Sequence, residues 1–264
     1  MTESNDIATV ISACSLDARF LPFCLREART FSKEIVVSAF HRRLDGSPEP
    51  DEWHGWLEAM CAPFAARVVW TSNRESEPAK WHHNQARWAG IQTVSSPWLM
   101  LLDADEIVES VPFTAWFSEA LRAQFHSASF ACFWYFRGAA IRSKCIERCG
   151  LLVRKAKCTK ALMFTENERY SLCREPRYLH QEPKSGLGKP FVHHYSWVHP
   201  KAAMLSKVKA WAHKDDKPWV GLVHAEFDRQ FNPDVDSDFV HHYRFDRCEP
   251  YADVGDFSQA DSRE

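Results

Sequence analysis

The stretch PWLMLLDADE, residues 97–106, decides the fold expected for this chain. Residues 98–102 form an unbroken apolar run of five, which is typical of a central parallel strand buried on both faces. The run stops at Asp103, and Asp105 and Glu106 follow, so three carboxylates lie within four residues where the strand ends. Ligands of open α/β sheets bind outside the carboxyl ends of the strands. The stretch therefore predicts a parallel sheet with a site at its edge.

Two interpretations of the three carboxylates stay open on the residues alone. Clustered hard oxygen ligands at a strand end suit Mg²⁺ or Mn²⁺ shared with a phosphate. The alternative is a solvated loop that begins the next helix, where the helix dipole favours acidic residues over positions 106–109. Because a D-x-D pattern is common by chance, the pattern does not choose between the two.

Strands and helices alternate upstream of this stretch. Apolar runs predict strands over residues 7–13, 34–40 and 67–71, and helical periodicity predicts helices over residues 18–31, 52–62 and 78–94. This alternation implies a parallel sheet with right-handed crossovers. The chain has no G-x-G-x-x-G and no G-x-x-x-x-G-K-[ST] pattern, so a phosphate bound here would need a metal.

The downstream half alternates less regularly. We expect strands over residues 129–138, 150–154 and 191–197, and helices over residues 113–125, from Pro200 onward, and over residues 219–227. The polar segment 155–189 has weak periodicity, which is typical of loops over a site. From residue 249 onward the chain is acidic and poor in apolar residues, which predicts a flexible tail over 249–264.

Composition indicates a globular protein and excludes some partners. Hydrophobic residues make up 45% of the 264, and the 11 Trp and 18 Phe argue against disorder. A net charge of −2 gives no global basic field, so nucleic acid is not an expected partner. No apolar run approaches the roughly 20 residues that cross a bilayer, and the N-terminus lacks the basic segment of a secretory signal. We expect a cytoplasmic protein without a transmembrane segment; peripheral association with a membrane is compatible with these features.

Two segments resemble a known family. NQARWAGIQTVSSPWLMLLDADEIVE, residues 84–109, resembles the region around the D-x-D motif of the family 2 glycosyltransferases, in which an N-x-x-R helix precedes a strand ending in Asp-x-Asp. The family's first strand and helix resemble residues 9–31, and HHYSWVHPKAAMLSKVKAWAHKDD, residues 193–216, is similar to a region of a subset of these enzymes. The chain departs from the family at the end of its second strand, where residues 38–40 replace the usual nucleoside-binding Asp.

The resemblance implies a fold and an activity. The fold would be GT-A, a Rossmann-like, mostly parallel mixed sheet flanked by helices, with a C-terminal helical extension. Residues 1–248 would form one domain, of which 7–110 would be the nucleotide-binding half and 111–248 the acceptor half with the C-terminal helices. The implied reaction is a metal-dependent transfer of a sugar from a UDP- or GDP-sugar to a glycan, lipid or protein acceptor, with inversion at the sugar carbon.

The resemblance also implies a metal centre. Asp105 is the expected protein ligand of Mn²⁺ or Mg²⁺, which would act as a Lewis acid on the leaving diphosphate. Asp103 is expected to contact sugar or ribose hydroxyls, or to reach the metal through water. His193 and His194 are neighbours on a strand and face opposite ways, so at most one points into the site, and we select His194 as the second ligand.

Five further residues are expected to bind the nucleotide or diphosphate: Asp45, Asn84, Arg87, Lys207 and His213. Asp45 would be a displaced equivalent of the missing nucleoside-binding Asp. Arg87 either contacts the nucleotide or holds Asp103 in a bidentate pair. Lys207 has the alternative of a solvated charge on a helix.

An inverting transferase also needs a carboxylate that deprotonates the acceptor hydroxyl. The candidates are Glu166, Glu168, Glu175 and Glu182. We select Glu166 as the catalytic base. Trp134 and Tyr135 offer rings on which a sugar could stack, although an aromatic strand more often belongs to the core.

Two other functions compete with this one. A nucleotidyltransferase also pairs carboxylates with a metal, but it commonly has a Gly-rich basic loop after its first strand, and SLDARF, residues 15–20, contains no glycine. A non-catalytic binding module stabilised by zinc is the other. The nine cysteines, an odd number without an export signal, indicate reduced thiols. Four of them, Cys145, Cys149, Cys158 and Cys173, match no strong zinc spacing, so free buried thiols are favoured.

Overall fold

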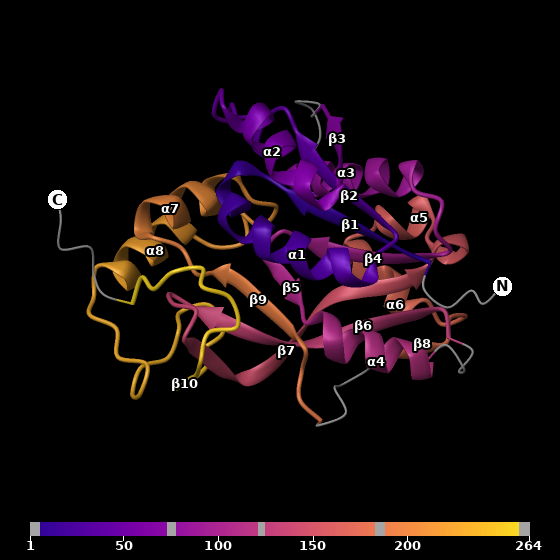
Figure 1. The fold of residues 1–264 in the computed structure, drawn as a ribbon. Helices are drawn as coiled ribbons and strands as arrows, with labels where there is room; N and C mark the ends of the chain where they lie inside the picture. The colour runs from indigo at the N-terminus through magenta and orange to yellow at the C-terminus, as the bar shows by residue number, and fades with distance from the viewer. Residues whose placement is uncertain (1–5, 73–77, 121–124, 183–187, 259–264) are drawn as a thin grey trace.

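A ten-stranded mixed sheet runs through the part of the chain that the computed structural model describes, residues 6–72, 78–120, 125–182 and 188–258 (Figure 1). The strands are β1 Ile7–Ala13, β2 Glu34–Phe40, β3 Arg67–Thr71, β4 Trp98–Asp103, β5 Glu106–Val108, β6 Ser127–Phe136, β7 Ile141–Arg154, β8 His180–Gln181, β9 Val192–Trp197 and β10 Phe245–Arg247. Their order is β3-β2-β1-β4-β7-β6-β9-β5, with β10 paired to β7 and β8 to β6.

The helices flank this sheet. They are α1 Leu21–Phe31, α2 Trp53–Cys61, α3 Ala79–Thr93, α4 Ser110–Ala120, α5 Lys160–Met163, α6 Ser171–Arg174, α7 Lys201–Ala210 and α8 Trp219–Phe227. Short 3-10 turns occur at η1 Ser15–Phe20, η2 Ala62–Phe64, η3 Lys155–Lys157 and η4 Glu168–Tyr170. Among the residues with a described position, no helix is both long enough and apolar enough to cross a membrane.

The parallel half of the sheet confirms the alternation expected from the sequence. Strands β3, β2, β1 and β4 are neighbours and all run parallel, with α1, α2 and α3 between them in the chain. In this register Ser12, near the end of β1, lies beside both Ser38 of β2 and Asp103 of β4. The carboxyl ends of these strands therefore meet at one edge, where Asp103 lies.

The second half of the sheet is mixed. β7 pairs antiparallel with both β4 and β6, whereas β6 and β9 are parallel. Residues 106–108 form β5, which pairs antiparallel with β9 and sets Glu106 opposite His194. The alternative of a helix beginning at Glu106 is therefore wrong, because backbone pairing with β9 extends this segment, and α4 begins at Ser110.

Alternating side chains divide the core between the two faces of the sheet. In β1, Ile7 and Ile11 belong to the cluster that includes α1, α2 and α4. Ala8 and Val10 belong to the cluster that includes α3 on the other face. A third cluster joins α7 and α8 to β6, β9 and β10 at one end of the molecule (Figure 1). Helices thus cover both faces of the sheet and leave the strand ends for a site.

Several expected boundaries differ from the structure. The expected helix over 18–31 is η1 followed by α1, and the expected strand over 150–154 is the end of a longer strand that starts at Ile141. The expected helix over 113–125 is described to residue 120, with residues 121–124 outside the described part. The segment 155–189 contains short helical turns as well as loops, and its residues 183–187 are not described.

The expected flexible tail is wrong for residues 249–258. Ala252 and Val254 are 2% and 4% exposed and belong to the core. The Tyr251 ring stacks on His193 at 4.2 Å between centroids, and the backbone N–H of Phe257 donates to the carbonyl of Arg137 at 2.6 Å. Composition missed this segment because a few apolar residues, spaced by two, are enough to anchor it. Residues 259–264 lie outside the described part.

Candidate functional site

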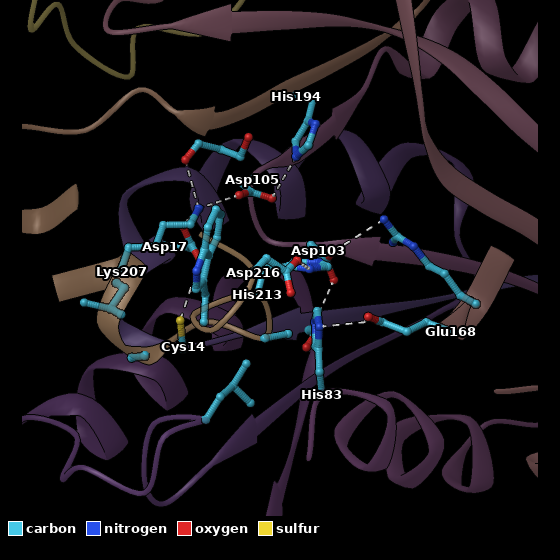
Figure 2. A pocket seen from close by; sticks show the side chains of 18 of the residues that line it. Cys14, Asp17, His83, Asp103, Asp105, Glu168, His194, Lys207, His213 and Asp216 are labelled. Carbon is cyan, nitrogen blue, oxygen red and sulfur yellow. Dashed lines mark hydrogen bonds and ion pairs between the residues drawn. The ribbon is translucent and has the colours of Figure 1, made fainter. Parts of the chain in front are cut away.

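A cavity of about 670 Å³ opens at the carboxyl ends of the parallel strands. Ser12 and Ala13 of β1, Phe40 of β2 and Asp103 of β4 contribute to its wall, which continues through β9 and α7. Two groups of charged side chains line it (Figure 2). We call them the Asp103 cluster, with His83, Arg87, Glu168 and Arg169, and the Asp105 cluster, with Asp17, His194 and Lys207.

The Asp103 cluster is a network of paired charges. Arg87, on α3, donates to both carboxylate oxygens of Asp103 at 2.7 and 2.9 Å and to Glu168 at 2.7 Å. His83 Nε2 lies 3.1 Å from Asp103, and Arg169 Nη2 lies 3.4 Å from it. Arg87 thus holds Asp103 as expected, but through the single nitrogen Nη2, because Nη1 donates to Glu168. Burial would raise the pKa of Asp103, but Arg169, Arg87 and His83 outweigh it and hold that pKa well below its usual range.

Glu106 is a buried hydrogen-bond partner of two members of this cluster, Arg169 and Asp103. Its side chain is 1% exposed and accepts hydrogen bonds from Arg169 Nη1 at 2.9 Å and from the backbone N–H of Asp103 at 2.9 Å. The third carboxylate of the D-x-D-E stretch is therefore a buried partner of Arg169, whereas Asp103 and Asp105 line the cavity. Glu106 thus fixes the Asp103 backbone and Arg169, while Arg87 and His83 hold the Asp103 carboxylate.

The Asp105 cluster is centred on a buried ammonium group. Lys207 Nζ donates to Asp17 at 2.7 Å, to Asp105 Oδ2 at 2.9 Å and to the Ser196 carbonyl at 3.1 Å. Lys207 is 6% exposed, so its interpretation as a solvated helical charge is wrong. Burial favours a neutral Asp17, but Lys207 and His199 lower its pKa well below the usual value.

His194 lies across from Asp105 on the cavity wall. Its Nε2 is 3.9 Å from Asp105 Oδ1, which is too long for a hydrogen bond but suits two ligands of one cation. Within the described residues, Oδ1 receives no hydrogen bond, while Oδ2 is held by Lys207. Burial opposes charging of the ring, but Cys132, Asp105 and Glu106 raise the pKa of His194 to about 10. These surroundings favour positive charge, and a metal ion held by one oxygen and one nitrogen would take the place of the ring proton.

The structure brings some of the remaining expected residues into the cavity and leaves others out. Glu166 and His213 are exposed and line the cavity, and His213 pairs with Asp216 at 2.9 Å. Asn84 is 1% exposed and does not line the cavity; its side-chain oxygen accepts from Arg87 at 3.4 Å. Asp45 is not on the wall either, because its carboxylate folds back onto the backbone N–H and hydroxyl of Ser47.

The other candidate bases and the aromatic pair are also divided between the cavity wall and the rest of the molecule. Glu168 is held by Arg87, Glu175 pairs with Arg177 at 2.5 Å, and Glu182 pairs with Arg148. Glu175 and Glu182 are not on the cavity wall. Trp134 lines the cavity. Tyr135 points to the opposite face of the sheet, where its hydroxyl lies 2.7 Å from His193 Nδ1, so it offers no ring to a ligand there.

The structure agrees with the free thiols favoured from the sequence. All nine cysteines are unpaired by disulfides, although Cys145 is exposed and Cys173 half-buried. Of the four cysteines compared with zinc spacings, Cys149 alone lies in a group with metal-binding spacing among the described residues, and its partners are Cys132 and His194. No short sequence motif contains all three residues, because Cys132, Cys149 and His194 lie on the different strands β6, β7 and β9.

Sequence reasoning missed three important residues. Asp17 lies just after β1, in the position where a parallel strand delivers a side chain to the sheet edge, and this position was a usable signal. Arg169 lies in η4 and His83 in α3, each surrounded by residues without a distinctive pattern. Only the tertiary contacts identify these two as partners of Asp103.

Comparisons with known proteins concern the fold. No family model matches the sequence, and a search of curated proteins finds no match. Among solved structures, the chain is similar to the inositol-1-phosphate CTP transferase from T. maritima at 10% identity and a TM-score of 0.49, over 78% of this chain and 97% of that one. It is similar to S. aureus TarS 1-349 at 11% identity and a TM-score of 0.49, over 89% and 76% of the two chains.

A second TarS structure gives the same result. For S. aureus TarS 1-349 in complex with UDP, identity is 10%, the TM-score is 0.50, and coverage is 76% of this chain and 63% of that one, which is less than two thirds. At such identities the similarity is one of fold alone. The expected fold class, a mixed α/β sheet of the GT-A kind flanked by helices, is confirmed.

Proposed function

We propose that this protein is a glycosyltransferase that takes a sugar from a UDP- or GDP-sugar. The observation that carries the proposal is the pair Asp103 and Asp105 at the end of β4, on the wall of a 670 Å³ cavity at the switch from parallel to antiparallel strands. Such a crevice is where α/β sheets bind nucleotides. The fold likeness to TarS in complex with UDP supports the same choice of ligand.

The charged side chains that line the cavity would hold the sugar-nucleotide donor through a metal ion. Seven Asp or Glu and seven Arg or Lys side chains line the cavity, so a bound diphosphate would add negative charge to a balanced wall. Mn²⁺ or Mg²⁺ at Asp105 and His194 would supply the missing positive charge and polarise the leaving diphosphate. Arg87 fixes Asp103, whose side chain stays 25% exposed on the cavity wall, where ribose or sugar hydroxyls would bind.

Glu166 is the base that this arrangement favours. It lines the cavity, is exposed and sits two residues from Glu168, whose carboxylate Arg87 already binds. Burial raises the pKa of Glu168, but Arg87 and His83 outweigh it and lower that pKa, which makes Glu168 a weak proton acceptor. Glu166 would take the proton of the acceptor hydroxyl as its oxygen attacks the sugar carbon from the face opposite the diphosphate.

The acceptor would bind along aromatic side chains. Trp134, Trp197, Trp211 and Trp219 line the cavity, and Trp197, Trp211 and Trp219 contact one another around α7 and α8. Trp134, Trp197 and Trp219 are 1%, 3% and 6% exposed, so the half-buried Trp211 is the ring that would meet a sugar, with the other three behind it. This wall suits a glycan, or the sugar of a glycosylated lipid or protein.

The first test is release of nucleotide. Purified protein is incubated with a panel of UDP- and GDP-sugars and Mn²⁺ or Mg²⁺, and free UDP or GDP is measured. We expect one donor to be turned over, and Asp105→Asn to lower the rate by about 10²-fold or more. The exposed variant Asp246→Asn is the matched control and should keep the rate. Release of a sugar 1-phosphate in place of UDP or GDP, with the nucleoside monophosphate passed to an acceptor, would reassign the chain to nucleotidyl transfer.

The second test concerns the base. Glu166→Gln should lower kcat by about 10² to 10⁴-fold with little change in donor KM, since the amide keeps the shape of the side chain but accepts no proton. Glu182→Gln, which changes a carboxylate away from the cavity, is the control. Unchanged kcat in Glu166→Gln would remove this residue from the mechanism.

A further inference from the structure

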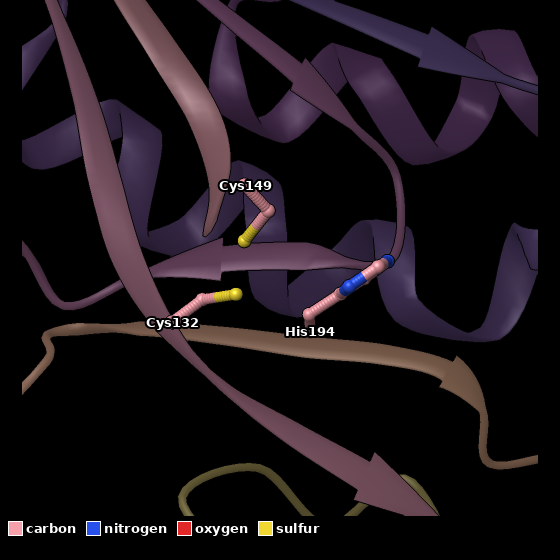
Figure 3. Close-up of side chains that lie close together, drawn as sticks. All are labelled: Cys132, Cys149 and His194. Carbon is pink, nitrogen blue, oxygen red and sulfur yellow. The ribbon is translucent and has the colours of Figure 1, made fainter. Parts of the chain in front are cut away.

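Two cysteines and a histidine meet on three neighbouring strands. Cys132 lies on β6, Cys149 on β7 and His194 on β9, and one ligand atom from each lies within 4.8 Å of the others (Figure 3). On β6, residues 130, 132 and 134 point to the same face of the sheet. Cys149 pairs with Phe130 and His194 pairs with Trp134, so Cys132, Cys149 and His194 share that face. Backbone pairing therefore sets their positions.

The three side chains are enclosed on one side and open on the other. Cys132 and Cys149 are 0% and 1% exposed, whereas His194 lines the cavity with Asp105. Nδ1 of His194 is buried and has no hydrogen-bond partner among the residues that the structure describes. An unsatisfied ring nitrogen beside two buried thiols is costly unless a further ligand is present.

We propose that Cys132, Cys149 and His194 bind Zn²⁺. Thiolate and imidazole ligands select zinc, whereas Mn²⁺ and Mg²⁺ prefer oxygen. Ligand atoms of a tetrahedral zinc ion lie about 3.3 to 3.8 Å apart, as its Zn–S and Zn–N bond lengths require. Small rotations of side chains already within 4.8 Å reach that spacing. Both thiols lose their protons to solvent when the ion binds.

A fourth ligand would complete a tetrahedral site. A carboxylate lies beside each ring nitrogen of His194, Glu147 Oε2 at 3.9 Å from Nδ1 and Asp105 Oδ1 at 3.9 Å from Nε2. Because Nδ1 is the nitrogen without a hydrogen-bond partner among the described residues, Glu147 or a water would complete the zinc site. The inference deepens the proposed function, because it assigns His194 to zinc and leaves Asp105 as the protein ligand of Mn²⁺ or Mg²⁺. It rests on that function for the role of Asp105 beside a donor diphosphate, but zinc binding itself is measurable without turnover.

The experiment measures metal binding directly. Reduced protein is stripped of metal under nitrogen and titrated with Co²⁺, then with Zn²⁺. We expect one Co²⁺ per chain, visible bands of tetrahedral cobalt, a near-ultraviolet thiolate-to-cobalt charge-transfer band, and loss of all these on adding one equivalent of Zn²⁺. Mn²⁺ at the same concentration should not displace the cobalt.

Variants test the three ligands. Cys132→Ser and Cys149→Ser should each weaken Zn²⁺ binding at least about 10-fold, and the matched control Cys61→Ser, at a thiol that is also 1% exposed, should bind as the parent does. Because a buried serine could unfold the chain, His194→Gln, at a side chain that is 21% exposed, gives a second test with the same expected loss.

Three results would overturn the assignment. They are absence of the charge-transfer band in the parent, an unchanged band in Cys132→Ser and Cys149→Ser, and a disulfide between Cys132 and Cys149 in protein purified with reductant. The zinc site and the proposed function fail separately. Zinc binding without nucleotide release would leave the site and remove the transferase, and turnover in a chain that binds no zinc would do the reverse.

Discussion

Asp17 illustrates what a single residue contributes to this site. Its carboxylate binds Lys207 at 2.7 Å and lies 3.3 Å from His199 Nε2, although no motif marks it in the sequence. Lys207 and Asp17 are 190 positions apart in the chain. The pairing neutralises a lysine that would be costly to bury alone, and it orients that lysine toward Asp105.

Replacing this carboxylate gives a prediction about stability and pH. The pKa of Asp17 is lowered in the folded state, so its ionised form stabilises the fold above its unfolded pKa of about 3.9. That contribution is lost as the pH falls through the lower folded pKa. We expect Asp17→Asn to lower the free energy of unfolding by about 1 to 3 kcal/mol at pH 7.

Urea denaturation of parent and Asp17→Asn between pH 7 and the acid limit of the fold checks this. The difference between the two proteins should be constant above about pH 4 and should shrink at lower pH. Asp246→Asn, at a side chain that is 54% exposed, should show almost no difference at any pH. A difference that grows on acidification would contradict the assigned sign.

Elements show where close packing sets the geometry of the site. Helix α3 carries His83 and Arg87 to Asp103, and Gly90, one turn further on, faces β1 and β2. A Cβ at Gly90 would lie 2.2 Å from Ser38 Oγ and 2.7 Å from Val10 Cγ1. The missing side chain therefore lets α3 pack close to the sheet, and this close packing brings Arg87 within hydrogen-bond distance of Asp103.

Gly90→Ala should lower the free energy of unfolding by about 1 to 3 kcal/mol because the helix must move off the sheet. Gly221→Ala on α8, where a Cβ meets nothing within 4 Å, is the matched control and should raise it by about 0.4 to 1 kcal/mol. Chemical denaturation measures both. Equal stability of Gly90→Ala and the parent would mean that α3 shifts without cost.

At the scale of the whole molecule, the C-terminal segment closes the core. Residues 252 and 254 belong to the same cluster as β1 and α1, and Gly138 bridges to Asp256 next to the turn between β6 and β7. One core cluster thus contains residues from both β1, near the start of the chain, and the segment 252–254, near its end. Removing the packing of residues 252 and 254 should therefore destabilise the whole fold.

Val254→Asp tests that connection. A charge at a position that is 4% exposed should lower the free energy of unfolding by more than about 3 kcal/mol, with a corresponding fall in Tm. Asp253→Ala, at the exposed neighbour, should stay within about 0.5 kcal/mol of the parent. Calorimetry compares them. A parent-like Tm in Val254→Asp would show that residues 249–258 contribute little.

The sequence by itself determined the parallel half of the sheet and the position of Asp103 and Asp105 at its edge. Apolar runs and helical periods are local, so strands such as Ile7–Ala13, Glu34–Phe40 and Arg67–Thr71 could be predicted from them with correct bounds. The two aspartates lie at the strand end because an apolar strand buried on both faces does not continue through charged residues.

Only the tertiary structure decided which charges meet. Lys207 and Asp17, Arg169 and Glu106, and the group of Cys132, Cys149 and His194 come from distant segments. The register of β5, β6, β7 and β9 and the packing of α3 and α7 bring them together. Register and helix packing depend on the whole core at once, and no window of sequence contains them.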